Sequence, residues 1–392
     1  MTTESFVDSN LLAQVRIAPE YVAAKFGLRN HWYPVRLADE VDENKPLAVT
    51  LLGENILLNR IDGRVYALKD RCIHRGVALS RKIECHTKGT ITCWYHGFTY
   101  RFDDGVLCDI VAVKSSNVIG RRRIKTYPVE EVQGLVFVFV GDDDFEPPPL
   151  AHDVPPGFLD ADMTVRAQWR EVNANWRIGA ENGFDSTHIY IHKDSVLVDD
   201  AGLALPLGLQ PQGDHAFETQ VGSDGPSGVF DNFSPDSVVP IFNGTIEGEE
   251  VLRGAVNGKN LLPHSISMWL PCVLKVDPWP APDLTQFEWY VPIDGERHIY
   301  LQTLGRRCRT DSEVAAFDRE FHERWVPAAL NGFNDDDVWA REATQLFYAD
   351  DRGWLEEQLY EPDGNIVVWR NFVAKHARGF QQPEHIDPPW RE

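Results

Sequence analysis

Two short segments, CIHRG at residues 72–76 and CWYHG at residues 93–97, constrain this chain more than any other feature. Each contains one cysteine and one histidine and ends in glycine, and together they read C-x-H-x18-C-x2-H. Two thiolates and two imidazoles suit a tetrahedral zinc ion. They equally suit a [2Fe–2S] cluster in which one iron takes two cysteines and the other takes two histidines.

The distribution of the four residues separates these two interpretations. Zinc fingers pair cysteine with cysteine and histidine with histidine, whereas here each segment contributes one of each. Two loop tips of this kind can hold opposite ends of a two-iron cluster, and the glycines allow the backbone to approach its sulfurs. The spacing therefore favours the iron–sulfur cluster, with a structural zinc site as the alternative.

The other four cysteines, at positions 85, 108, 272 and 308, lack a partnered histidine at this spacing. Clustered cysteine beside histidine in a chain of this length indicates metal binding more than a disulfide framework. We expect Cys85, Cys108, Cys272 and Cys308 to be buried structural thiols.

Length and charge limit the classes of partner. The chain has 392 residues and is 43% hydrophobic, which fits about two globular domains. Its formal net charge of −22 argues against nucleic acid or an anionic membrane surface as a partner. No apolar run approaches the roughly 20 residues of a membrane span, and the N-terminus lacks a secretory signal pattern. We expect a cytoplasmic protein.

Strands and helices are grouped along the chain, which predicts an α+β fold. Residues 47–68 and 134–142 read as strands, as do parts of 261–305, whereas 173–195 and 311–357 have helical character. The segment GDDDFEPPPLAHDVPPGF, residues 141–158, can form neither a helix nor a central strand. We place a boundary there, after an all-β domain at 30–150 and before a larger domain at 151–392 with an antiparallel sheet flanked by helices.

A second group of polar residues lies beyond this boundary. On a helix, Asp185, His188 and His192 would share one face, and two imidazoles one turn apart can bind a metal. Alone, H-x3-H is more often a pair of unrelated histidines. Beside a two-iron cluster, the pattern suggests the two-histidine, one-carboxylate site of non-haem iron.

The carboxylate of such a site must come from farther along the chain. FNDDDVWARE supplies three consecutive aspartates at the start of an expected helix: Asp335, Asp336 and Asp337. Acids in a first turn also interact favourably with the helix dipole, so at least two of them need no metal. Periodicity does not decide which one points inward.

Both motifs resemble those of the Rieske non-haem iron ring-hydroxylating oxygenases. CIHRG and CWYHG resemble the two cluster boxes, with a slightly longer gap than is common, and Asn182, Asp185, His188 and His192 match N-x2-D-x2-H-x3-H. Many members have four residues between the histidines where this chain has three. The likeness covers nearly the whole chain, through RNHWYPV, LKDRCIHRG, DGVLCDI, ENGFD with HIYIHKDS, QFEWYVPID and GFNDDDVWAREA.

The resemblance implies a set of cofactor ligands. Cys72 and Cys93 would bind one iron of the Rieske cluster, and His74 and His96 the other. A mononuclear Fe(II) would be held by His188, His192 and a later aspartate, with Asp337 favoured and Asp336 second. Asn182 and Asp185 would be catalytic, and Asp185 would connect an iron histidine to a Rieske histidine, His96 or less favourably His74, of a neighbouring subunit in a homotrimer.

The resemblance also implies an activity. It indicates the terminal oxygenase of a multi-component dioxygenase that uses O2 for angular cis-dihydroxylation of carbazole-like heteroaromatics. Electrons would come from NADH through a partner reductase and a ferredoxin, because no G-x-G-x-x-G follows a strand in this chain. A monooxygenase or demethylase of the same family is the alternative. A non-enzymatic electron carrier or zinc protein is disfavoured by the second motif and by the large domain that contains it.

Three further predictions concern the substrate pocket, the ferredoxin and the N-terminus. By family position, the pocket wall would contain Gly183, Ile189, Ile266, Leu274, Trp279, Gln286 and Phe333, with Gln286 as a polar group. The basic run RRRIK, through Arg121, Arg122 and Arg123 and with help from Arg16, would attract an acidic ferredoxin. Residues 1–29 would be a helical segment that packs on the catalytic domain.

Overall fold

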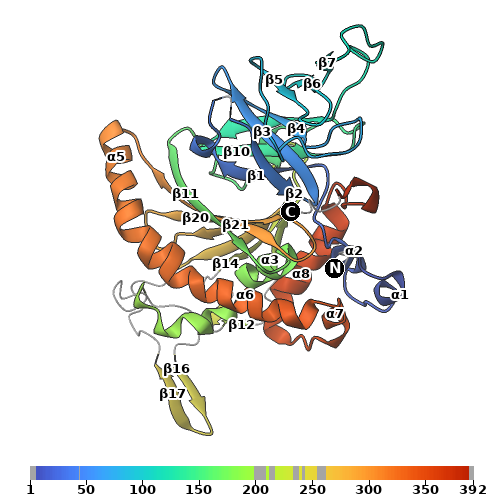
Figure 1. Ribbon diagram of the computed structural model, residues 1–392. Helices are drawn as coiled ribbons and strands as arrows, with labels where there is room; N and C mark the ends of the chain where they lie inside the picture. The colour runs from blue at the N-terminus through green and yellow to red at the C-terminus, as the bar shows by residue number, and fades with distance from the viewer. Residues whose placement is uncertain are drawn as a thin grey trace.

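The fold joins a β-rich part to a larger part of sheet and helices. The computed structural model describes residues 6–43, 45–197, 209–211, 217–232, 238–240, 243–253 and 262–387. In Figure 1 the β-rich part lies at the top, and the long sheet and its helices lie below it. The α+β prediction is confirmed.

Three small antiparallel sheets form the β-rich part. Its hairpins close in tight turns such as Asp62–Gly63, where both residues have positive φ, as type I′ turns require. Strand β10, expected from GLVFVFVGD, is buried at all six positions. The sheets are β1 (His31–Leu37), β10 (Leu135–Val140) and β9 (Val129–Val132); β2 (Leu47–Leu51), β3 (Glu54–Ile61), β4 (Arg64–Lys69) and β8 (Thr126–Tyr127); and β5 (Thr90–Thr92), β6 (Phe98–Arg101) and β7 (Leu107–Ile110).

A seven-stranded antiparallel sheet forms the centre of the larger part. In spatial order it consists of β11 (Met163–Val172), β21 (His298–Arg307), β20 (Thr285–Pro292), β19 (Val273–Asp277), β18 (Ser265–Trp269), β14 (Gly228–Asn232) and β13 (Glu218–Gln220). Two separate hairpins pair β12 (Leu209–Pro211) with β15 (Val238–Pro240), and β16 (Asn243–Ile246) with β17 (Glu249–Arg253).

Strand β20 separates the core from the functional side of this sheet. Side chains alternate along a strand, and the ring centroid of Trp289 lies 6.3 Å from Phe137 of β10 and 5.1 Å from Phe158. Gln286 and Glu288, on the opposite face, line a cavity instead. The same strand therefore packs against the β-rich part and forms the wall of a pocket.

Helices cover this functional face. Helix α3 (Trp176–Phe184) contacts strands β18 to β21, and one long helical run along the sheet is formed by α5 (Asp311–Glu320), η4 (Phe321–Phe333) and α6 (Asn334–Tyr348). Segment η4 is a π-helix that contains Pro327, a helix type that is rare and frequent at functional sites. Helix α2 (Pro19–Ala23) packs on α8 (Gly364–His376), and α1 (Ser9–Leu12) packs on α2.

The remaining helical segments are short. They are α7 (Gly353–Glu356) and the 3-10 turns η1 (Ala38–Glu40), η2 (Leu150–His152), η3 (His188–Asp194), η5 (Glu361–Asp363) and η6 (Pro383–His385). No helix among the described residues has both the length and the apolar run that crossing a bilayer requires.

The prediction that Asp185, His188 and His192 share one face of a single α-helix is wrong. Helix α3 ends at Phe184, Asp185 is its C-cap with φ −69° and ψ 115°, and the histidines lie on the separate 3-10 helix η3. The Asp185 carboxylate accepts from the Thr187 amide and hydroxyl, at 2.7 and 2.9 Å. Aspartate readily forms such local turns in competition with helix continuation.

Candidate redox and catalytic sites

Two loops of matching design present the cluster motif. In each, the cysteine amide donates to the carbonyl five residues later, 2.9 Å for Cys72 to Val77 and 2.7 Å for Cys93 to Phe98. The closing glycine amide donates back to the cysteine carbonyl, at 2.8 Å from Gly76 and 2.9 Å from Gly97. These glycines have φ of +71° and +70°, a conformation that L side chains rarely adopt.

The loops bury the thiols and expose the imidazoles. Cys72 and Cys93 are 2% and 1% exposed, neither is in a disulfide, and His74 and His96 are exposed with ring centroids 4.5 Å apart. Buried unoxidised thiols beneath two facing imidazoles fit the thiolate and histidine ends of a Rieske cluster.

Local interactions already favour a thiolate at Cys72. The hydrogen bond with Cys93 is the largest cause that lowers the Cys72 pKa, to about 6, and Tyr100 adds to it. The Tyr100 hydroxyl lies 3.2 Å from the Cys72 sulfur. Hydrogen bonds to sulfur tune the potential of an iron–sulfur centre, so Tyr100 is a contact that motif spacing alone did not indicate.

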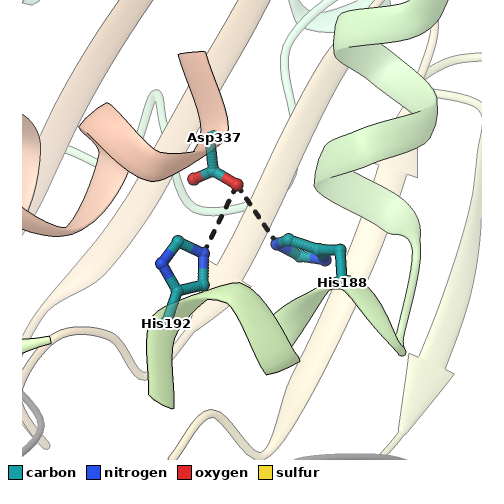
Figure 2. A group of neighbouring side chains, drawn as sticks. All are labelled: His188, His192 and Asp337. Atoms are coloured by element: carbon teal, nitrogen blue, oxygen red, sulfur yellow. Dashed lines mark ion pairs between the residues drawn. The ribbon is translucent and has the colours of Figure 1, made fainter. Parts of the chain in front are cut away.

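The second site joins η3 to the first turn of α6. The Asp337 Oδ1 atom lies 3.4 Å from the Nε2 atoms of both His188 and His192 (Figure 2). Potential ligand atoms of these three residues all fall within 4.8 Å of one another. Both His192 ring nitrogens and Asp337 Oδ1 are buried without a hydrogen-bond partner. Such groups are costly unless a cation satisfies them, so this site fits a metal ion.

The surroundings of His188 set which nitrogen faces this point. Its Nδ1 lies in contact with the Asp185 carbonyl, to which Nδ1–H donates, so Nε2 is the ring nitrogen that faces Asp337 and would be a metal ligand after it loses its proton. Burial lowers the His188 pKa, but the adjacent Asp337 carboxylate outweighs it and raises that pKa to about 9. Conversely, the two imidazoles overcome the effect of burial and hold the Asp337 pKa well below its usual range.

The three aspartates of α6 have different surroundings. Asp335 pairs with Arg170 at 2.5 Å, away from the histidines. Asp336 Oδ2 reaches only the outer nitrogen of His192, Nδ1, at 3.5 Å, and its side chain is 45% exposed. Asp337 alone lies between both inner nitrogens. The helix start prediction is confirmed, and tertiary packing separates the three acids.

Asp185 and Asn182 lie beside this group without pointing at its centre. Asp185 Oδ1 accepts from Thr187, and no hydrogen bond reaches Oδ2 within the part of the chain that the structure describes. Asn182 accepts from Arg341 Nε at 2.6 Å. Asp185 therefore retains an acceptor for an outside partner, whereas the Asn182 carbonyl is occupied.

A cavity next to His188 and Asp337 contains every residue that sequence analysis assigned to the pocket wall. Gly183, Ile189, Ile266, Leu274, Trp279, Gln286 and Phe333 all line it. The Phe333 ring stacks on His192 with centroids 3.6 Å apart, which joins the apolar wall to the histidine pair.

Four polar lining residues were missed: Ser186, Glu288, Asn334 and Arg341. Glu288 follows Gln286 by two residues, the spacing at which strand residues share a face. Asn334 and Arg341 bracket Asp337 at helical spacing on α6. Periodicity could thus have indicated Glu288, Asn334 and Arg341 once β20 and α6 were assigned, whereas Ser186 lies in the turn between α3 and η3 and follows no such spacing.

The expectation of four buried thiols was right for Cys272 and Cys308 and wrong for the other two. Cys85 is exposed and Cys108 only half-buried. Both lie in the β-rich part, where short strands and long loops leave little core to cover them.

The four arginines that sequence analysis assigned to ferredoxin docking, Arg16, Arg121, Arg122 and Arg123, are all exposed.

Comparison with known proteins places these sites in one family. Models described as Rieske [2Fe-2S] domain and homotrimeric ring hydroxylase match residues 31–128 and 139–381. The terminal oxygenase component of carbazole 1,9a-dioxygenase from Metapseudomonas resinovorans is 54% identical over 97% of this chain and 99% of that protein.

Solved structures agree with the sequence matches. The terminal oxygenase of carbazole 1,9a-dioxygenase from Novosphingobium sp. KA1 has a TM-score of 0.91 at 54% identity, covering 96% of this chain and all of that one. A reduced complex between oxygenase and ferredoxin in carbazole 1,9a-dioxygenase gives 0.94 at 51% identity, with full coverage of both chains.

A Rieske cluster, a mononuclear non-haem iron and O2 as co-substrate follow from these matches, with the electrons of NADH supplied through a reductase. The chain belongs to the homotrimeric ring hydroxylases that carry a Rieske [2Fe-2S] domain, and it is the terminal oxygenase of a Rieske dioxygenase.

Proposed function

We propose that this oxygenase adds both atoms of O2 across an angular C=C bond of a carbazole-like heteroaromatic. The observation that carries the proposal is the His188, His192 and Asp337 group at the wall of a largely apolar cavity. The 54% identity to carbazole 1,9a-dioxygenase components supports the choice of substrate. Two electrons and two protons, derived from NADH through a reductase and ferredoxin, balance the addition.

We assign the iron to His188, His192 and Asp337, a set that would supply oxygen activation because it leaves coordination positions open. The protein's own contribution is orientation. The Asp185 carbonyl holds the His188 ring, and Phe333 stacks on the His192 ring. Leu274, Ile266 and other apolar walls exclude water from the place where the aromatic ring lies.

We assign the cluster to Cys72, Cys93, His74 and His96, and Asp185 to the connection between cluster and iron. In Figure 1 strands β5 to β7 lie at the top of the molecule and α6 lies in its lower half. One subunit's own centres are therefore poorly placed for direct transfer. The free Asp185 oxygen would accept from His96, or less favourably His74, of the next subunit in the trimer and fix both imidazoles.

A ferredoxin would dock beside the cluster loops. Arg121, Arg122 and Arg123 are exposed and have no ion-pair partner among the described residues, in a chain with a formal charge of −22. Arg16 is a further candidate contact. Such a local positive patch on an acidic protein would orient an acidic partner.

We also propose a domain organisation and a cellular location for this chain. We divide the chain into an N-terminal segment at 1–29 that packs on the catalytic part, a Rieske domain at 30–150 and a catalytic domain at 151–392. The expected location is the cytoplasm, where ferredoxin and NADH reductase would be available.

The test is product analysis with ¹⁸O2. Purified protein is mixed with ferredoxin, reductase, NADH and carbazole, and the product mass is measured. Incorporation of two labelled atoms at the angular position is expected. A single labelled atom would support the monooxygenase alternative, and no turnover of carbazole by iron-replete, red-brown protein would overturn the substrate assignment.

A further inference from the structure

The turn between α3 and η3 that contains Asp185 is held by a segment much later in the chain. The Asn365 side-chain amide donates to the carbonyl of Phe184, the last residue of α3. On the other side of Asp185, the Tyr360 hydroxyl donates to the Thr187 hydroxyl oxygen at 3.0 Å. Tyr360 is the N-cap of η5 and Asn365 lies in α8, so the residues before and after Asp185 are both tied to the η5–α8 segment.

The backbone of Tyr360 is fixed although its side chain is 55% exposed. Its amide donates to the Asp363 carboxylate at 3.0 Å, and the Asp363 amide donates back to the Tyr360 carbonyl, also at 3.0 Å. The Tyr360 hydroxyl is therefore brought to Thr187 from a defined position, and this contact is not a by-product of ring burial.

The hydrogen bonds from Tyr360 to Asp185 run in one direction. The Thr187 amide and hydroxyl both donate to Asp185 Oδ1, at 2.7 and 2.9 Å. A hydroxyl has a single hydrogen to donate. Because Thr187 gives its hydrogen to Asp185, its oxygen is the acceptor for Tyr360, and donation from Tyr360 strengthens the bond between Thr187 and the carboxylate.

These contacts decide which oxygen of Asp185 remains free. The terminal torsion of an aspartate side chain is broad, so the plane of the carboxylate is not set by its own rotamer. Two donors on Oδ1 set it instead. Within the part of the chain that the structure describes, no hydrogen bond reaches Oδ2.

We propose that Thr187 and Tyr360 are positioning residues for electron transfer between subunits. Their hydrogen bonds fix the plane of the Asp185 carboxylate, so that Oδ2 stays turned toward the cluster histidine of the neighbouring subunit. The step that they support moves one electron from a cluster, which ferredoxin reduces again, to the iron of the next subunit. The inference rests on the proposed role of Asp185 and deepens it.

The first test follows cluster oxidation by visible absorbance after reduced trimer, substrate and O2 are mixed. Thr187→Val keeps the size of the side chain and the amide donor, and should slow the oxidation about tenfold, as expected for one hydrogen bond to a charged group. Tyr360→Phe removes a neutral bond one step farther away and should slow it about threefold. Thr187→Ser, the matched control, keeps the hydroxyl and should stay within about twofold of wild type.

The second test measures the cluster potential of the resting trimer by spectroelectrochemical titration, which needs no turnover. A carboxylate that accepts from a cluster imidazole makes that ligand more electron-rich and lowers the potential. The potential should therefore rise in Thr187→Val and return to the wild-type value in Thr187→Ser. Loss of iron, cluster or trimer in Thr187→Val would instead assign a structural role to Thr187 and overturn the inference.

A double-mutant cycle tests the route of the effect. In an Asp185→Asn background, Thr187→Val should slow cluster oxidation no further, and an additional slowing would contradict the inference. A normal rate in Tyr360→Phe would refute the chain of hydrogen bonds even if Thr187→Val does not fold. Normal cluster oxidation in Asp185→Asn would show that the proposed role of Asp185 is wrong as well, whereas slow oxidation there beside normal rates in Thr187→Val and Tyr360→Phe overturns the inference alone.

Discussion

The cluster loops and the iron group both present two imidazoles, but the chain builds them in opposite ways. In the loops, backbone hydrogen bonds within five residues place each cysteine, and the imidazoles lie exposed at the tips. In the iron group, η3 and α6 meet through tertiary packing, and His192 is completely buried. The short-range contacts of the loops leave the cluster histidines accessible to partners. The tertiary packing around the iron group buries its residues away from water.

The largest expected effect follows from breaking the long-range site. His192→Ala and Asp337→Ala should each remove about one iron per chain and lower turnover by a factor on the order of 10³ or more. The visible spectrum of the cluster should stay unchanged, because within one chain the described residues show no contact between its loops and this group. Iron and acid-labile sulfide assays measure both centres in one sample.

Asp335→Ala is the control for these variants, since Asp335 pairs with Arg170 on the other side of the helix. It should retain iron and most of the activity. Loss of iron in Asp336→Ala but not in Asp337→Ala would contradict the assignment within the aspartate run.

The next effect concerns the link between the two regions. Asp185→Asn keeps the shape but loses the charge and one acceptor, so turnover should fall on the order of 100-fold with cluster and iron contents near normal. In single-turnover mixing of reduced trimer, substrate and O2, the loss should appear in cluster oxidation. Normal cluster oxidation would rule out the bridge, and loss of iron would make Asp185 a ligand.

A smaller effect is expected when the basic run on the surface of the cluster domain is neutralised. Replacing Arg121, Arg122 and Arg123 together by Gln should slow reduction by ferredoxin about tenfold at low salt and flatten its salt dependence. Reduction by dithionite is the control and should change little. Equal slowing with both donors would indicate damage to the cluster.

The smallest expected effect concerns the cluster potential and tests whether a single neighbouring hydroxyl, that of Tyr100, tunes it. Tyr100→Phe removes the hydrogen bond to the Cys72 sulfur and should lower the cluster potential by tens of millivolts, roughly the value of one hydrogen bond for a one-electron couple. Tyr66→Phe, on β4 of the same domain, should leave the potential unchanged in spectroelectrochemical titration. A matching shift in both variants would refute the specific role of Tyr100.

The sequence alone determined what depends on neighbours along the chain. Paired Cys–His boxes with closing glycines predicted the cluster family, and β10 followed from LVFVFV, because loop geometry and strand burial depend on a few adjacent residues. The α+β class also followed from the grouping of strands and helices. Family resemblance, not periodicity, supplied the pocket residues and the preference for Asp337.

The tertiary structure decided what depends on residues far apart in sequence. Asp335, Asp336 and Asp337 share one helical turn and the same chemistry, so only the position of η3 beneath α6 distinguishes them. The break of the expected helix at Asp185 arises because its side chain captures the Thr187 amide, which periodicity does not encode. The contact between Asn334 of α6 and the Glu288 carboxyl of β20, at 3.0 Å, likewise forms only when sheet and helix pack, since a hydrogen bond requires its partners within about 3 Å.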